Sequence, residues 1–288
     1  MAKTLIITDS ASDISAEDEA SYGIRVLPFS VTMGSRTYIS RRDFDNEEFY
    51  RLLSDFDGIP VTSQITPFSF QQLYEELLEA GWDEAILVLI NAQGSATYQN
   101  SLLARESFYA EHPEAAERLR IRAVDARSYT CAYGYAVVEA AKKALAGASA
   151  DEIYAYLTDW MSRSRIYAGL YTLKYAAKSG RIPSAAAFVG DAIGMKPIMR
   201  IEDGSISTRD KVRGEKNIVP FVVRRACEEM EPGSPYCVIY GCDHELEPAV
   251  RGAMIKALGY PPAASYQIGA AIAINAGPRV SGVMFRRK

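Results

Sequence analysis

Histidine is almost absent from this sequence. Only His112 and His244 occur in 288 residues, so chemistry that needs several imidazoles is not expected. The four cysteines form no C-x-x-C pair, and the chain has enough apolar residues to build its own core. Free thiols are therefore expected in place of disulfides. The sequence predicts no metal site and no cofactor.

The chain also lacks an excess of positive charge and any long apolar run. Its formal net charge is -4 and its pI is about 5.5, which argues against a nucleic-acid-binding surface. Near the N-terminus the apolar run is only Leu5-Ile6-Ile7, too short for a signal peptide. No apolar run approaches the roughly 18 residues of a membrane-spanning helix. We therefore expect a cytoplasmic protein that binds no nucleic acid.

Several standard catalytic motifs are missing. The sequence around Ser95 is Gln-Gly-Ser-Ala-Thr, which does not match the G-x-S-x-G of many serine hydrolases. The stretch 190–196 lacks the G-K-[ST] ending of a phosphate-binding P-loop. Residues 237–245 contain two cysteines, an aspartate, a histidine and a glutamate, but their spacing fits no standard zinc site. A strand end that turns into a helix explains that segment equally well.

The most informative stretch runs from Glu84 to Ala104. An apolar run at 85–90 is followed by a polar turn and then by a helical pattern, which predicts a buried strand, a turn and a helix. The first turn of such a helix offers free backbone N–H groups, and Ser95 and Thr97 add hydroxyl donors. This pattern favours a site for a carboxylate or phosphate. The alternative is that Ser95 or Thr97 serves only as the N-cap of the helix.

The first half of the chain repeats this alternation of strand and helix. Buried strands are expected at 4–8, 85–90 and 121–125, with a second β-like run at 24–31. Helices are expected near 15–22, after Asp45, at 67–78, after Ser95 and at 133–145, and a polar loop is expected at 61–67. This order predicts a doubly wound, mostly parallel sheet. Ser10, Ser95 and Asp125 would then share the rim at the carboxyl ends of the strands.

The pattern changes after residue 150. Short β runs at 165–171, 197–201, 236–240 and 281–285 are mixed with helical segments at about 215–230 and 246–257, and Gly204 is typical of a hairpin tip. A mixed sheet with helices on one side is expected there. We therefore predict an N-terminal α/β/α domain over residues 1–150 and a smaller α/β domain over residues 151–288.

A set of short motifs spread over the whole chain resembles the DegV family, the fatty-acid-binding proteins that serve bacterial fatty acid kinase. The motifs, in order, are Ile7-Thr8-Asp9-Ser10, Thr62-Ser63-Gln64, Ser95-Ala96-Thr97-Tyr98-Gln99, Asp125-Ala126-Arg127-Ser128, Gly180-Arg181-Ile182, Lys196-Pro197-Ile198, Val212-Arg213-Gly214 and Gly277-Pro278. Each motif alone is weak, but their order and spacing together are specific.

The resemblance implies a function. The protein would take up a long-chain fatty acid, bury the acyl tail between or within two α/β domains and present the carboxylate to a separate fatty acid kinase catalytic subunit. That kinase would bind ATP and make the acyl phosphate, so this chain would be a carrier subunit and not itself an enzyme. A monomer that contacts the membrane surface transiently is expected. Two other functions stay open: a binding-only lipid carrier, and an enzyme acting on a small hydroxylated or phosphorylated metabolite at the same polar rim.

The resemblance also implies roles for individual residues. The carboxylate would be bound by Thr62 and Ser95, with Ser63, Ala96 and Thr97 nearby. Arg181 would contact the kinase. Asn275 and Arg279 stand where the resemblance leads us to expect His and Gly, and we predict that both face the carboxylate. The alternative is that Arg279 points to solvent and that the protein only binds the lipid. Candidates for the wall of the acyl tunnel are Phe188, Ile193, Met195, Ile198 and Met199.

Overall fold

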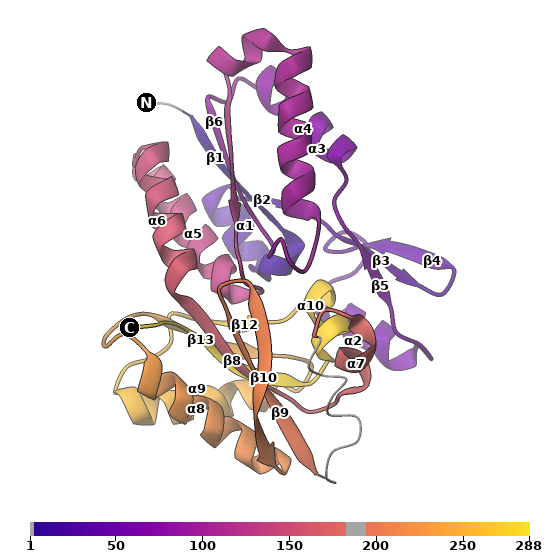
Figure 1. Cartoon of the computed structure of the whole chain (residues 1–288), viewed down its shortest axis with the longest axis vertical. Helices are drawn as coiled ribbons and strands as arrows, with labels where there is room; N and C mark the ends of the chain where they lie inside the picture. Colours follow the sequence, from indigo (N-terminus) through magenta and orange to yellow (C-terminus); the bar gives the residue numbers. More distant parts are fainter. Residues whose placement is uncertain (1–2, 183–193) are drawn as a thin grey trace.

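The computed structural model describes residues 3–182 and 194–288. Within them the chain forms three sheets, and Figure 1 shows the two larger ones packed end to end along the long axis of the molecule. The predicted α/β class, with a parallel sheet in the first half and a mixed sheet in the second, is confirmed.

The first sheet is parallel throughout and has the order β2-β1-β6-β7. Its strands are β1 (Thr4–Asp9), β2 (Arg25–Leu27), β6 (Glu84–Leu89) and β7 (Arg120–Asp125). Its helices are α1 (Ala16–Tyr22), α3 (Pro67–Glu79), α4 (Thr97–Glu111), α5 (Cys131–Leu145) and α6 (Ala150–Arg163), with 3-10 turns η1 (Ser10–Ser12) and η2 (Pro113–Glu117). Helices α3 and α4 lie on one face, and α1, α5 and α6 lie on the other (Figure 1).

Local sequence explains where these elements begin. Thr66 accepts a hydrogen bond from the Ser69 N–H and Pro67 is the first residue of α3, so the polar loop ends as expected. Ser149 and Glu152 form a capping box that starts α6. Helix α6 packs on α5, β6 and β7, although it lies just beyond the predicted domain boundary at residue 150. That boundary stays a prediction.

The second sheet has the order β10-β9-β8-β13-β11-β12. Its strands are β8 (Ser164–Leu170), β9 (Met195–Glu202), β10 (Ser205–Arg213), β11 (Tyr236–Tyr240), β12 (Ala264–Gln267) and β13 (Val280–Arg286). Only the β11–β12 pair is parallel. Gly204, with φ of +80°, forms the predicted tip between β9 and β10.

The two faces of this sheet have different partners. Helices α8 (Ile218–Glu229) and α9 (Leu246–Leu258) cover the outer face, as predicted, and η4 (Glu215–Asn217) precedes α8. The inner face packs against α5 of the first unit, and the short helices α7 (Lys174–Ser179) and α10 (Ala270–Ala276) lie at its end. Figure 1 shows α8 and α9 below this sheet and α5 above it.

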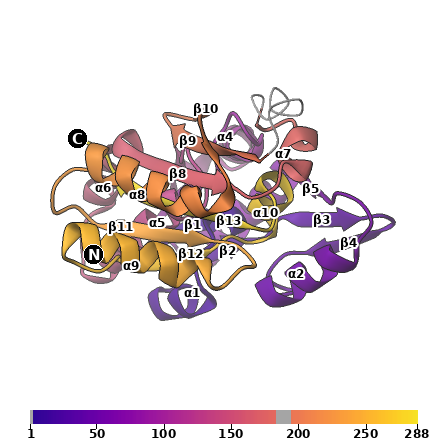
Figure 2. The same cartoon turned by 90° about the horizontal axis from the view of Figure 1, so that it is seen from below.

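A small antiparallel sheet with the order β4-β3-β5 projects from the side of the molecule together with α2 (Figure 2). Its members are β3 (Ser30–Met33), β4 (Arg36–Ile39), β5 (Val61–Ser63) and α2 (Asn46–Asp55). Two predictions were wrong here. The β-like run 24–31 is two strands in different sheets, since Pro28 cannot continue a ladder, and the polar loop 61–67 begins as strand β5.

Candidate functional site

A cavity of about 910 Å³ lies between the carboxyl ends of the first sheet and the inner face of the second. Its volume is near the upper end of the range for small-molecule sites, about 300–1,000 Å³. Most of its wall is aliphatic. The apolar lining residues include Ile90, Ile166, Ala168, Ile182, Met199, Ile201, Ile206, Ile239, Ile268, Ile272 and Val280.

Strand periodicity explains which residues reach the cavity. On β9, Met199 and Ile201 line the cavity. Ile198 is on the opposite face of the strand and packs in the outer core with Ile218 and Val222 of α8. On β8, Ile166 and Ala168 line the cavity for the same reason. Strands β8 and β9 therefore turn one face to the cavity and the other to the helix layer.

Polar side chains gather where β5 meets the start of α4, which we call the polar end. Thr62, Gln64, Ser95 and Gln99 line the cavity there, and the Ile65 N–H donates to Thr97 between the two segments. Gln93, Tyr129, Thr130, Ser205 and Asn275 are further polar lining residues. Within the described lining, Arg181 is the single charged side chain. A cavity with an aliphatic wall and hydroxyl and amide groups at one end suits a ligand with a long apolar body and a small polar head.

Ser95 and Thr97 lie at the start of α4 in an arrangement that the sequence did not reveal. The N-cap of α4 is Ala96, which makes no side-chain cap bond. The Ser95 hydroxyl oxygen accepts from the Thr97 N–H at 3.3 Å and lies 2.9 Å from the Thr97 hydroxyl. Ser95 therefore holds the first amide of the helix and also lines the cavity.

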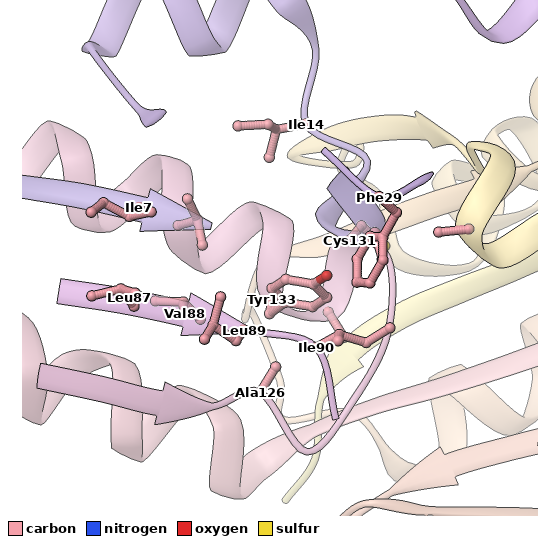
Figure 3. Close-up of a cluster of buried hydrophobic side chains, with 14 of the residues drawn as sticks. Ile7, Ile14, Phe29, Leu87, Val88, Leu89, Ile90, Ala126, Cys131 and Tyr133 are labelled. Atoms are coloured by element: carbon pink, nitrogen blue, oxygen red, sulfur yellow. The ribbon is translucent and has the colours of Figure 1, made fainter. Parts of the chain in front are cut away.

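The loop that carries Ser95 is fixed by two acidic side chains. Asp9 accepts from the Ile90 N–H at 2.7 Å and from the Tyr133 hydroxyl at 2.6 Å, and Asp125 accepts from the Ala92 N–H at 3.0 Å. Figure 3 shows Ile90 and Tyr133 close together in the buried cluster beyond the end of β6. Burial raises the pKa of Asp9 to about 6, against the opposing effect of these hydrogen bonds.

Asn91 joins this loop to the second sheet. Its amide donates to the Tyr129 hydroxyl at 2.9 Å and to the Gly204 carbonyl at 2.8 Å, and the Gly204 N–H donates to the Arg127 carbonyl at 2.8 Å. Glycine is favoured here because its φ of +80° is one that other residues rarely adopt, and a Cβ would also lie 2.9 Å from the end of the Gln93 side chain. The β9–β10 hairpin tip is thus attached to the loops after β6 and β7.

The structure brings some of the predicted site residues to the cavity but not others. Thr62, Ser95, Ala96, Asn275 and Arg181 line it. The Thr97 side chain is fully buried behind Ser95, where its hydroxyl oxygen accepts from the Ile65 N–H.

Other predicted positions lie outside the lining. Ser63 is exposed on β5. Ser10 does not share the rim with Ser95, because its hydroxyl accepts from the Phe29 N–H and borders a second, smaller cavity.

Arg279 lies outside the cavity lining, contrary to the expectation that it faces the carboxylate. Its guanidinium donates to Asp243 at 2.9 Å and to Glu215 at 2.5 Å, and it stacks 4.3 Å from the centre of the Tyr171 ring. Two carboxylates that are remote in sequence thus hold Arg279 in place directly before the first residue of β13. These partners raise the pKa of Arg279 in spite of its partial burial.

Asn275 and Arg181 both line the cavity and both bond locally. The Asn275 amide donates to the Ala271 carbonyl one turn earlier in α10, at 2.9 Å. The Arg181 guanidinium donates to the Ser179 carbonyl at 2.9 Å, and its side chain is exposed. Asn275 therefore contributes an amide to the cavity lining, while Arg181 places a positive charge at the solvent side.

The predicted tunnel wall is met in part. Met199 lines the cavity, whereas Met195 and Ile198 do not, and Phe188 and Ile193 lie outside the described residues.

Metal-binding potential in the described part of the chain is confined to Glu75, Glu111 and His112, at the ends of α3 and α4. That group does not border the cavity. All four cysteines are free thiols, of which Cys131 and Cys237 are buried. No helix in the described segments 3–182 and 194–288 is long and apolar enough to cross a bilayer.

The fold and the cavity define an α/β protein in which two packed sheets enclose a largely apolar cavity with a polar end. Comparison with known sequences identifies the family. The model of the DegV family matches residues 3–288, and the chain belongs to that family. The predicted resemblance is confirmed.

Two relatives of known sequence match this chain over nearly all of its length. A DegV domain-containing protein of Caldanaerobacter subterraneus is 30% identical over 294 residues and covers 100% of both chains. Another, from Clostridium perfringens, is 27% identical and covers 98% of both chains.

Solved structures share the fold. A stearic acid-binding protein from Eubacterium ventriosum superposes with a TM-score of 0.89 at 24% identity, covering 100% of this chain and 99% of its own. A fatty-acid-binding DegV family protein from Thermus thermophilus gives a TM-score of 0.85 at 25% identity, covering 99% and 100%.

Proposed function

We propose that this protein binds one long-chain fatty acid, with the acyl tail in the 910 Å³ cavity and the carboxylate at Thr62 and Ser95. The observation that carries the proposal is the division of the cavity into an aliphatic wall and a polar end. Similar full-length chains that bind fatty acids, from Eubacterium ventriosum and Thermus thermophilus, support it.

The energetics favour such a ligand. Each methylene that leaves water contributes about 0.8 kcal/mol, so a tail of a dozen or more methylenes offsets the loss of translational freedom on binding. At the polar end, hydrogen bonds from hydroxyls and amides to a carboxylate are about twice as strong as bonds between neutral groups. A neutral set of donors, with Arg181 at the solvent side, can bind an anion and leave one of its oxygens accessible.

We further propose that the bound carboxylate is presented to a separate fatty acid kinase, which makes the acyl phosphate. In this role the chain supplies the burial of the tail and the orientation of the head group, and Arg181 at the solvent side of the cavity contacts the kinase. An enzyme acting on a small hydroxylated metabolite at the same polar end is the competing function. A lipid carrier without a kinase partner is the other.

Organic extraction of the purified protein, followed by lipid mass spectrometry, tests the binding proposal. We expect about one acyl chain per protein, and delipidated protein should take up added hexadecanoic acid. A protein that is empty and takes up no fatty acid would contradict the proposal and favour the small-metabolite enzyme. Acyl-phosphate formation after addition of a fatty acid kinase and ATP then separates a kinase subunit from a simple carrier.

A further inference from the structure

The short turn η1 lies between Asp9 and Asp13, whose carboxylates bond to two different segments next to the cavity. Asp9, before the turn, accepts from the Ile90 N–H and so fixes the loop that carries Ser95. Asp13, after the turn, accepts from the Gly269 N–H at 2.9 Å. The second of these bonds joins residues 256 positions apart, and it connects the segment after β1 of the first sheet to the segment after β12 of the second sheet.

Gly269 is the residue at which α10 begins. It occupies the N-cap position of α10 and has no side chain with which to cap the helix. The Asp13 carboxylate holds its amide, and the Tyr50 hydroxyl donates to the preceding carbonyl of Ile268 at 2.5 Å. Helix α10 then contributes Asn275 and three apolar side chains to the cavity. The position of one wall of the site thus depends on contacts at Asp13 and Tyr50.

We infer that Asp13 is a positioning residue for the ligand: its ionised carboxylate fixes the start of α10, and protonation of Asp13 lowers the affinity for the acyl ligand. This inference rests on the proposed function and adds a form of regulation to the same site. Asp13 itself borders the second, smaller cavity and does not line the 910 Å³ cavity.

The surroundings of Asp13 bring its titration into the physiological range. Burial raises its pKa to about 7, and the negative charge of Asp9 acts in the same direction. The Thr130 hydroxyl, the Gly269 N–H and the positive charge of Arg41 oppose that shift. The other titratable groups that face it or share its cavity are Asp18, Glu19 and Asp45, Tyr50 of α2, Cys131 and Tyr133 of α5, Tyr240 of β11 and Tyr266 of β12.

The direction in which ligand affinity changes with pH follows from how strongly Asp13 accepts a hydrogen bond in its two protonation states. Above pH 7 Asp13 is ionised and accepts a charge-assisted hydrogen bond from Gly269. Below pH 7 the neutral carboxyl accepts about half as strongly, so the start of α10 is held less firmly. Because the bound ligand contacts α10, its affinity should fall as the pH falls through 7.

Asn is a suitable replacement for testing this role. Asp13 has φ of +55°, a left-handed conformation that Asn adopts readily and Ala does not. In Asp13→Asn the amide oxygen can still accept from Gly269. Its nitrogen can donate to the Thr130 hydroxyl, which lies next to Asp13. The variant therefore keeps the contact and loses the titration.

The experiment measures the affinity of delipidated protein for hexadecan-1-ol at pH 6 and pH 8, because this probe has no titrating head group. Wild-type protein should bind about fivefold more weakly at pH 6, as a neutral acceptor replaces a charged one. Asp13→Asn should lose most of this difference, and the part that remains is due to Asp9, whose pKa of about 6 also lies in this range. Asp13→Ala should bind weakly at both pH values. Thermal melting of each variant shows whether it is folded.

Hydrogen exchange of the α10 amides in the ligand-free wild-type protein provides a second readout that needs no variant. After correction for the intrinsic pH dependence, protection of α10 should be lower at pH 6 than at pH 8. If the protein binds the alcohol with the same affinity at both pH values, or if α10 protection does not change, the role of Asp13 is refuted while fatty-acid binding stands. If neither the alcohol nor hexadecanoic acid binds, both proposals fail.

Discussion

The hydroxyl oxygen of Thr97 lies 2.9 Å from that of Ser95 and also accepts a hydrogen bond from the Ile65 N–H. Since the Thr97 oxygen serves as an acceptor there, its own hydrogen can point to Ser95. The Ser95 oxygen also accepts from the Thr97 N–H, so its acceptor capacity is used within the protein. The Ser95 hydrogen is then left to donate into the cavity, as an anionic ligand requires.

Replacing Ser95 by Ala should weaken binding of a fatty acid much more than binding of its methyl ester. Loss of a hydrogen bond to a charged group costs roughly 1.5–3 kcal/mol, or about 10- to 150-fold in affinity. The ester has no charge and should lose only a few-fold. Titration calorimetry with both ligands measures the difference. Equal weakening, or none, would mean that Ser95 only holds the start of α4.

Ala168→Phe should block the acyl tail. Ala168 is 3% exposed, lies on β8 and points its Cβ into the cavity wall, so a larger side chain occupies space that the ligand needs. We expect binding of long-chain acids to fall at least tenfold while the protein stays folded. Ile198→Val is the control, because Ile198 faces the outer core and not the cavity. An unchanged affinity in Ala168→Phe would place the tail elsewhere.

Asn275→His should raise acyl-phosphate formation by a kinase partner with little change in fatty-acid affinity. Asn offers an amide to the ligand but cannot become cationic or relay a proton as phosphoryl charge develops. His can do both. Single-turnover assays with saturating fatty acid measure this effect. A rate no higher than that of the wild-type protein would show that position 275 does not limit transfer.

Arg279→Gly should leave fatty-acid affinity unchanged, because the Arg279 guanidinium is held by Asp243 and Glu215 outside the cavity. The pair is partly exposed, so its removal should lower the free energy of unfolding by only about 0–1 kcal/mol. Urea unfolding and ligand titration together test this. A clear fall in affinity would return Arg279 to the head-group site.

The buried Asp9 should make the protein less stable as the pH rises from 5 to 7. Its pKa is about 6 in the folded protein and 3.8 in the unfolded chain, so the folded state binds the proton more tightly. Its contribution to stability is therefore present at low pH and lost as the pH rises through 6. Asp9→Asn should reduce this dependence in urea unfolding without abolishing it, because Asp13, with a pKa of about 7, adds a slope of the same sign. If the free energy of unfolding of the variant changes with pH as steeply as that of the wild-type protein, groups other than Asp9 cause the dependence.

Much of the fold followed from local pattern in the sequence. The continuous apolar runs of β1 and β6 mark strands buried on both faces, and the periodic stripe of α3 marks its buried side. Pro28 was the signal that could have divided the run 24–31 into two strands. Strand β5 of the small sheet was missed because it has only 3 residues and pairs with β3, about 30 positions earlier in the chain.

The site was only partly predictable, because its geometry depends on long-range contacts. Ser95 and Thr62 carry a local signal, namely hydroxyls at turns next to helices. Nothing near Asn91 in the sequence indicates that it bonds to Gly204, which lies 113 residues away. Likewise, Arg279 has its partners 36 and 64 residues away, so only the structure shows that its charge is already paired.

A crystal structure of the protein loaded with 16-bromohexadecanoic acid tests the central claim most directly, because bromine marks the tail and the electron density locates the carboxylate. We expect the carboxylate oxygen at about 2.5–2.7 Å from the Ser95 hydroxyl, and the bromine against the aliphatic wall formed by β8 and β9. A bromine signal at the polar end, or an acid bound outside the cavity, would contradict the account.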